Sequence, residues 1–550
     1  MAGRGGAGRR PRAVFMAFGT QGDVFPIAAL AAAFACDQQE YAVVFITHSA
    51  HRSLSAHLAA SSVRYMPVSS PPVLAAEQLE NISSDSIQSN HERESFSMRK
   101  KAIQAEHRKE CLSFVEEVFG NDPSISGDFI VINFFALEGW HLAELFQVKC
   151  VIAAPYFVPY SAPTSFKRQF KQTFPLLYKY FQEAPANTVQ NHALGNHYIN
   201  VVKQLQVCWT DIIHWMWALF MESWGSWRND CLNLSPIPFT DPVTNLPLWH
   251  VREESPLLLY GFSKEIVECP GYWPFNAHAC GFWFLPMDWQ FSCDKCMELS
   301  GNINSSFGGM LCANHSSLEH FLTRNAYSSR PIFVGLSSIG RMGFLRNPKA
   351  FLMVLKAAIE STDYMFILFS SGYKPLDSAI QSIASSVNES RGVDSPSLGG
   401  DSALLFNGRL FCFLGSIPYS WLFPRCAAAI HHAGSGSTAA ALLAGIPQVT
   451  CPFMMDQFYW SERLQWLGVA PEPLQRQNLV PDNDDALSIH NAADVLVGAI
   501  RSALSPETKA QAARIADRLS SEDGIGEALR ILKARVLTQN KIISSFIASK

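Results

Sequence analysis

The stretch AAAIHHAGSGSTAAALLAGIPQVTCPFMMDQFYW, residues 427–460, indicates most about the fold of this chain. Its apolar start predicts a buried strand that ends at the histidine pair, after which a Gly/Ser loop leads into an Ala/Leu-rich helix. Such a turn directs backbone N–H groups and the positive end of the helix dipole at one point, where a phosphate fits. An ordinary strand–turn–helix packed through small residues is the alternative.

Four residues of this turn are candidate phosphate ligands. Gly434 lets the backbone approach a ligand closely, and Ser437 and Thr438 add hydroxyl donors. His432 adds a further donor and, when protonated, a positive charge. We expect His431 to be a buried histidine with hydrogen-bonding partners rather than a ligand.

Asp456 and Gln457 follow the next predicted strand. They therefore fall at the carboxyl edge of the sheet, where ligands collect in open α/β folds. An acid beside an amide offers acceptors and donors for sugar hydroxyls, although such a pair is also common in solvated loops.

A second turn, FGTQGDVFPIAALAAAFA (residues 18–35), joins a short apolar run to a long apolar helix. Its one acid, Asp23, sits where the helix begins. The position suits a helix cap, and it also suits a carboxylate directed into a cleft.

Short apolar runs alternate with helical patterns in both halves of the chain, which predicts two α/β units with parallel sheets. A length of 550 residues agrees with two domains of roughly 200–250 residues each. We expect a polar excursion at 80–110, an aromatic helical insertion at 165–230, a low-complexity loop at 383–402 and helices from about 485 to 537. The predicted strands are 13–18, 41–47, 63–68, 128–133, 150–154, 332–336, 365–369, 410–414, 427–431 and 448–451, and one helix is predicted at 350–361.

Composition excludes several classes of function. Hydrophobic residues make up 48% and charged residues 16% of the chain, as in a globular protein. The net charge of −4 provides no basic field for nucleic acid, so we expect no nucleic-acid partner. No signal-peptide pattern and no membrane-spanning stretch is evident, which predicts a cytoplasmic protein and leaves peripheral membrane contact open.

The 13 cysteines show no regular spacing and are expected to be reduced and mostly buried. Cys293 and Cys296 form a lone C-x-x-C, and no second cysteine pair of this kind follows. A zinc site needs four ligands, so we expect no metal.

Five motifs in the right order resemble the sterol 3-beta-glucosyltransferase branch of the UDP-glycosyltransferase superfamily. The family patterns GTRGDVQP, HVTGYWFL and PHDWLFPRC correspond to GTQGDVFP (19–26), HACGFWFL (278–285) and PYSWLFPRC (418–426). The patterns HHGGAGTTAAGL and PFFGDQPFW correspond to HHAGSGSTAAAL (431–442) and PFMMDQFYW (452–460).

The resemblance implies a GT-B fold, in which two Rossmann-like α/β domains face each other across a cleft. The first domain, 13–297, would bind the acceptor, and the second, 319–537, would bind a UDP-sugar. Residues 298–318 would be the linker, the final helices would pack back on the first domain, and 1–12 and 538–550 would be tails.

The resemblance also implies roles for single residues. Asp23 would be the general base of an inverting transfer of glucose from UDP-glucose to a hydroxyl of a sterol or other lipid-like acceptor, without a cofactor. His141 is a candidate for the acceptor side. The donor site would comprise Ser338, Ile417, Trp421, His432, Gly434, Ser437, Thr438, Asp456 and Gln457.

Departures from the family pattern leave alternatives open. Gln21 replaces the usual arginine, and Ala433 replaces a glycine. Another hydrophobic acceptor, such as a terpenoid or phenolic compound, is one alternative. A GT-B protein that binds a lipid or nucleotide-sugar without turnover is the other.

Overall fold

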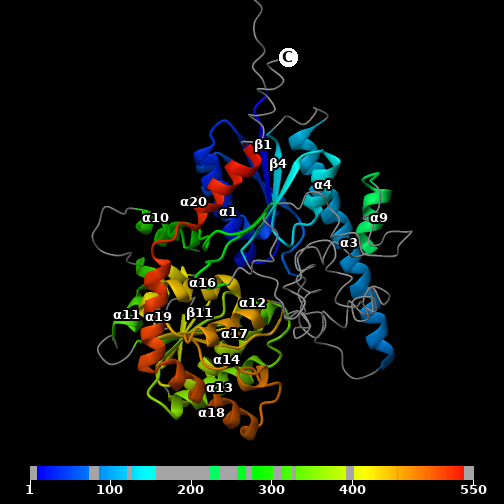
Figure 1. The fold of residues 1–550 in the computed structure, drawn as a ribbon. Helices are drawn as coiled ribbons and strands as arrows, with labels where there is room; N and C mark the ends of the chain where they lie inside the picture. The colour runs from blue at the N-terminus through cyan, green and yellow to red at the C-terminus, as the bar shows by residue number, and fades with distance from the viewer. Residues whose placement is uncertain are drawn as a thin grey trace, which may run out of the picture.

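The protein consists of two α/β units, one built from each half of the chain (Figure 1). The computed structural model describes residues 9–73, 86–120, 127–155, 222–234, 257–267, 276–291, 293–301, 311–324, 330–391, 402–415, 417–454 and 456–537.

The N-terminal sheet has seven parallel strands in the order β3-β2-β1-β4-β5-β6-β7. Most of its strands are apolar on both faces, as expected where helices cover a parallel sheet on both sides. The order reverses between β1 and β4, which creates a topological switch point there. The strands are β1 (Arg12–Met16), β2 (Ala42–His48), β3 (Val63–Val68), β4 (Phe129–Ile132), β5 (Lys149–Ala154), β6 (Leu257–Tyr260) and β7 (Ala277–Ala279).

The C-terminal sheet has six strands in the order β10-β11-β9-β8-β12-β13. Only the edge strand β10 is antiparallel, and the order reverses between β8 and β12. The predicted pair of α/β units with parallel sheets is therefore confirmed. The strands are β8 (Ile332–Gly335), β9 (Phe366–Phe369), β10 (Ser402–Leu405), β11 (Leu410–Phe413), β12 (Ala428–His431) and β13 (Gln448–Thr450).

Helices cover both sheets (Figure 1). In the first half they are α1 (Gln21–Asp37), η1 (Ser49–His51), α2 (Leu54–Ala60), α3 (Ser86–Phe119), α4 (Glu138–Leu145), α9 (Glu222–Asp230), η5 (Met287–Gln290) and α10 (Asp294–Gly301). In the second half they are η6 (Ala313–His315), α11 (Ser316–Arg324), α12 (Ser337–Arg341), α13 (Pro348–Glu360), α14 (Lys374–Arg391), α15 (Tyr419–Leu422), η7 (Phe423–Arg425), α16 (Ser435–Leu443), α17 (Gln457–Trp466), η8 (Arg476–Asn478), α18 (Ala486–Ala503), α19 (Pro506–Leu519), α20 (Gly524–Leu532) and η9 (Lys533–Leu537).

Two segments expected to be irregular are helical instead. The predicted excursion at 80–110 is largely occupied by α3, a 34-residue helix without glycine or proline. Its C-terminal part buries Cys111, Val115 and Phe119 at helical spacing, which the high polarity of the segment concealed. The predicted loop at 383–402 begins inside α14, which continues to Arg391. Most of the aromatic insertion at 165–230 lies outside the described residues.

The C-terminal helices return to the N-terminal domain. Ala528 and Leu532 of α20 belong to the same buried cluster as the apolar face of α1. The Trp283 indole N–H donates to the Gly524 carbonyl oxygen at 3.0 Å, and Lys533 pairs with Asp37 at 2.8 Å. The C-terminal helix α20 therefore connects the two units by packing against the N-terminal one.

Membrane-spanning character is absent from the described part of the chain. None of its helices is both long enough and apolar enough to cross a bilayer.

We predict that the contact of α20 with α1 contributes substantially to stability. Leu532 is fully buried, so Leu532→Ala should lower the free energy of unfolding by about 2–5 kcal/mol through lost packing and a residual cavity. Leu487→Ala, at a side chain 68% exposed on α18, should change it by about 0.5 kcal/mol or less. Urea unfolding followed by tryptophan fluorescence measures both, and equal midpoints for the two variants would contradict this packing.

Candidate active site

A cleft of about 1230 Å³ lies between the two units, and loops from both line it. Three of the contributing segments follow the carboxyl ends of strands beside a switch point. The segment after β1 carries Asp23, whereas the segments after β8 and β12 carry Ser338 and His432. Ligands of doubly wound folds bind in such crevices, so strand order alone brings these residues to one place.

The C-terminal side of the cleft is organised around the N-terminus of α16. Gly434 is the N-cap residue, and the Thr438 N–H donates to its carbonyl oxygen to close the first turn. The amides of Ser435, Gly436 and Ser437 precede that bond and have no acceptor within the helix. These three residues line the cleft, so their N–H groups and the helix dipole form an anion-binding end.

His432 lines the cleft next to Ser338. Burial lowers the pKa of His432 to about 4, so the imidazole is neutral at pH 7. Its Nε2 lies 3.4 Å from Ser338 Oγ, across the β8–β12 switch point. Burial therefore disfavours the positive charge that the sequence allowed for a protonated ring.

His431 is a buried core histidine, as predicted. Its Nδ1 accepts from the Ala433 N–H at 3.0 Å, and its Nε2 lies 2.8 Å from Gln448 Oε1. Because Nδ1 accepts a hydrogen bond, the ring proton is on Nε2, which donates to Gln448 Oε1. Both ring nitrogens therefore have hydrogen-bonding partners. Ala433 adopts a φ of 60°, a strained conformation for a non-glycine residue at the mouth of the phosphate loop.

Tyr419 is a cleft residue that sequence reasoning missed. Its hydroxyl hydrogen-bonds the Ser437 side chain, and its ring stacks on Phe423 at 4.5 Å. Burial raises the pKa of Tyr419, so the phenol stays protonated and orients Ser437. Its position within the PYSWLFPRC motif was the available signal.

Asp456 is the N-cap residue of α17, Gln457 is its first residue, and both line the cleft. The Trp460 indole N–H donates to Asp456 Oδ2 at 2.9 Å, and burial raises the pKa of Asp456 to about 7. Gln457 Oε1 accepts from the Phe453 and Met454 N–H groups. A ligand can therefore use the NH₂ group of Gln457, while its oxygen holds the loop.

Asp23 lies on the opposite wall, in the first turn of α1. The Thr20 N–H and hydroxyl both donate to Asp23 Oδ2, at 2.7 and 2.8 Å. These bonds favour the carboxylate, but burial outweighs them and raises the pKa of Asp23 to about 6. The capping role and the cleft-facing position, considered as alternatives from the sequence, therefore coexist.

Asn133, which directly follows β4, hydrogen-bonds the backbone of the loop that leads to Asp23. Its NH₂ group donates to the carbonyl oxygens of Phe18 and Asp23, and its Oδ1 accepts from the Phe18 N–H. Gly19 has a φ of 106°, and a Cβ there would lie 2.6 Å from Asp23 Oδ2. Asn133 thus acts on the backbone rather than on the carboxylate, and Gly19 leaves room for the carboxylate.

The two walls meet closely at the helix N-termini. A Cβ at Gly436 of α16 would lie 3.8 Å from the Gly22 Cα of α1. The charge of Asp23 contributes to the raised pKa of Asp456, although burial is the larger cause. Two carboxylates and two helix N-termini therefore share one partly desolvated space.

Three residues chosen from the sequence do not line the cleft. Trp421 is 3% exposed and packs in the core of the C-terminal unit, with the Arg425 guanidinium 4.1 Å from its ring centre. Thr438 is buried at the second turn of α16, beyond the exposed N–H groups. His141 is fully buried, with Nδ1 3.0 Å from the Arg228 guanidinium and Trp224 against its ring. Their positions in the sequence gave no information on which way the side chains point.

The N-terminal wall carries a polar–aromatic group that the sequence analysis did not single out. His107 Nδ1 lies 2.7 Å from Ser70 Oγ, and the His107 ring meets Phe18 edge-on at 4.4 Å. Burial lowers the pKa of the neighbouring His48 to about 3. On the other wall, the exposed Arg341 is a cation that lines the cleft.

Sequence comparison relates the chain to known glycosyltransferases. Residues 407–523 match the family described as Erythromycin biosynthesis protein CIII-like, C-terminal domain. A sterol 3-beta-glucosyltransferase of Arabidopsis thaliana is 26% identical over 310 residues, 56% of this chain and 38% of the relative. An O-mycaminosyltylonolide 6-deoxyallosyltransferase of Streptomyces fradiae is 26% identical over 328 residues, 58% of each chain. The chain spans less than half the length of the Arabidopsis relative.

Structural comparison identifies the fold. The crystal structure of the kitacinnamycin glycosyltransferase superposes with a TM-score of 0.52 at 13% identity, covering 96% of this chain and 100% of the other. Together with the strand orders and the interdomain cleft, this similarity confirms the GT-B architecture. The chain therefore has the GT-B fold, and part of its sequence is similar to sterol 3-beta-glucosyltransferases.

Proposed function

We propose that this protein is an inverting glycosyltransferase that moves glucose from UDP-glucose to a hydroxyl of a sterol or other lipid-like acceptor. One observation carries the proposal. Asp23, a carboxylate with a raised pKa, faces the N-terminus of α16 across a cleft shared by both units.

The donor would lie against the C-terminal wall. The N–H groups at the start of α16, with Ser437 and Ser338, would receive the diphosphate, and Ile417 would lie beside the uracil. Asp456 and the Gln457 NH₂ group would hold sugar hydroxyls. As the anomeric bond breaks, negative charge grows on the leaving UDP, and preorganised donors stabilise it without reorganisation. Arg341 would add a positive charge.

The acceptor hydroxyl would attack from the N-terminal wall. Inversion requires a single in-line displacement, in which a base removes the hydroxyl proton as the new bond forms. An aspartate with a pKa of about 6 is a stronger base than an ordinary one and is still largely ionised at pH 7. Asn133 and Gly19 would act as positioning residues for it.

The composition of the acceptor side supports a lipid-like substrate. Its cleft lining includes Phe18, Phe25, Phe282, Phe284 and Leu285. Apolar lining with a few polar groups is typical of sites for small hydrophobic molecules. Similarity to sterol glucosyltransferases supports the same choice, whereas similarity to the Streptomyces fradiae enzyme keeps other hydrophobic acceptors as the second candidate.

Gly434→Ala is predicted to weaken UDP binding at least tenfold. A Cβ at this position would lie 2.6 Å from His432 Nε2 and would displace that ring at the mouth of the phosphate loop. Isothermal titration calorimetry with UDP measures the change. Gly498→Ala is the matched control, because no atom lies within 4 Å of a Cβ there. Unchanged UDP affinity in Gly434→Ala would refute the donor-site assignment.

Asp23→Asn should lower kcat by about 10²–10⁴-fold while UDP affinity changes little, because an amide of similar shape cannot accept the proton. Asp37→Asn, at the exposed end of the same helix, should retain wild-type kcat. Release of UDP in the presence of acceptor measures both. Substantial transfer by Asp23→Asn would remove Asp23 from the role of base.

The pH profile provides an independent prediction. The raised pKa of Asp23 means that protonation begins near pH 6 rather than near pH 4. The base form is lost as the pH falls, so kcat/KM should decline about tenfold per unit below pH 6. A rate that stays constant down to pH 5 would contradict a base with this pKa.

Product analysis separates the candidate functions. The protein, UDP-glucose and a panel of sterols, terpenoids and phenols are incubated, and mass spectrometry detects hexosylated products. A hexosylated sterol supports the proposal, and a hexosylated phenol or terpenoid supports the second candidate. UDP binding without any product would favour a binding protein without turnover.

A further inference from the structure

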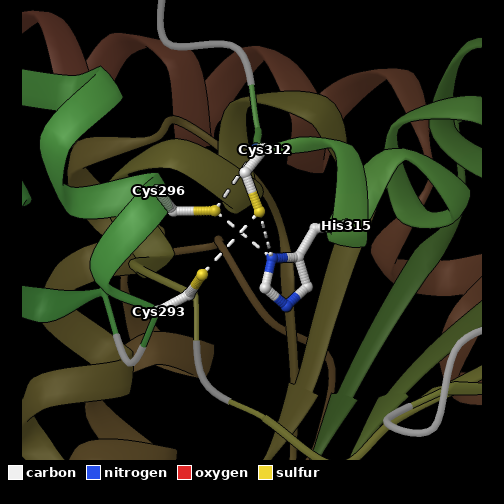
Figure 2. A group of neighbouring side chains, drawn as sticks. All are labelled: Cys293, Cys296, Cys312 and His315. Atoms are coloured by element: carbon white, nitrogen blue, oxygen red, sulfur yellow. Dashed lines mark hydrogen bonds between the residues drawn. The ribbon is translucent and has the colours of Figure 1, made fainter.

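Four metal-ligating side chains converge where the chain passes from one unit to the other (Figure 2). Cys293 directly precedes α10, and Cys296 lies within it. Cys312 directly precedes η6, and His315 is the last residue of η6. One ligand atom from each side chain lies within 4.8 Å of all the others. Cys296, Cys312 and His315 are buried, and Cys293 is partly buried.

The distances match a tetrahedral zinc ion. Cys293 Sγ lies 3.7 Å from Cys312 Sγ, while His315 Nδ1 lies 3.2 Å from Cys296 Sγ and 3.3 Å from Cys312 Sγ. Zinc–sulfur bonds of about 2.3 Å and zinc–nitrogen bonds of about 2.05 Å imply tetrahedral edges of about 3.8 and 3.6 Å. Adjustments of a few tenths of an ångström would therefore suffice.

We propose that Cys293, Cys296 and Cys312 Sγ, together with His315 Nδ1, bind one structural zinc ion. Three thiolates and one neutral imidazole are a donor set typical of structural zinc. Four protein ligands close the coordination shell, so no position is left for a substrate. None of the four side chains lines the interdomain cleft, which separates this site from the proposed transfer reaction.

The spacing along the chain agrees with this geometry. The four residues form C-x-x-C-x₁₅-C-x-x-H, a spacing within the range of zinc sites. The second half of this pattern, Cys312 and His315, is not a second cysteine pair, because its last residue is a histidine. The expectation of a metal-free chain conflicts with this grouping.

Surrounding groups favour the metal-bound form. The Cys312 N–H lies 3.4 Å from Cys296 Sγ, where it stabilises a thiolate. The His315 ring meets Phe413 of β11 edge-on at 5.4 Å, which orients the imidazole. Apolar side chains, among them Phe291, Leu311 and Leu318, enclose the group.

A disulfide explains the arrangement less well. The 3.7 Å between Cys293 and Cys312 Sγ far exceeds the S–S bond of about 2.05 Å. Such a bond would also leave the convergence of Cys296 and His315 unexplained.

Zinc would join the segment around Cys293 to the segment around Cys312, across the predicted interdomain linker. Because the His315 ring packs against Phe413 of β11, the zinc ion would also hold this connecting segment against the C-terminal sheet. A closed metal site adds its binding free energy to the folded state, because the ligands do not form a site in the unfolded chain.

Metal analysis of the full chain, purified under reducing conditions, tests the proposal. Mass spectrometry of the elements should find about one zinc per chain, because structural sites hold the metal tightly. Cys312→Ser and Cys293→Ser should each lose most of it. Cys36→Ser, at an exposed cysteine on α1, should retain it.

Cobalt substitution keeps the test decisive if the serine variants fail to fold. Wild-type protein, stripped with a chelator and reloaded with Co²⁺, should show the intense visible bands of tetrahedral cobalt with thiolate ligands.

Chelation alone should lower Tm, and zinc should restore it. Reduced wild type that holds no zinc and gives no such bands would overturn the proposal. Peptide mapping of protein kept without reductant and with zinc present is a second check. A Cys293–Cys312 disulfide found in that protein would also overturn the proposal.

Discussion

The parallel pairing of β8 with β12, and of β1 with β4, is the constraint on which the rest of the structure depends. Each pair joins strands far apart in sequence and opens a crevice at their carboxyl ends. In the C-terminal unit the crevice brings Ser338 to His432, and in the N-terminal unit it brings Asn133 to the Asp23 loop. The cleft forms where these two crevices face each other.

Burial then determines the chemistry of the cleft. Desolvation raises the pKa of Asp23 and Asp456 and lowers that of His432, so it disfavours charge at all three. Polar groups from neighbouring loops offset part of this cost, as Thr20 does for Asp23. Such a site would bind an anion mainly through the N–H groups of α16, with Arg341 at the exposed edge. The proposed base and the proposed anion site therefore have one physical origin.

Much of the architecture was predictable, because buried parallel strands appear as continuous apolar runs. Strands such as 41–47 and 150–154 were recognised in this way, with small errors at their ends. The helix α3 was missed because only its last turns are apolar on one face. β10 was missed because an exposed edge strand lacks a continuous buried run. His141 and Trp421 show that position in the sequence does not reveal whether a side chain faces the cleft or the core.

The sequence by itself determined the order of the strand–turn–helix motifs and the residue types at their loops, because periodicity and Gly/Ser turns act over a few residues. Only the tertiary structure decided which of those residues meet. Asn133 hydrogen-bonds the Asp23 loop, and Asp23 lies opposite the N-terminus of α16, although these residues are far apart in the chain. The same is true of the grouping of Cys293 and Cys296 with Cys312 and His315. The pKa values also belong to the tertiary structure, because they depend on how completely packing removes water from each group.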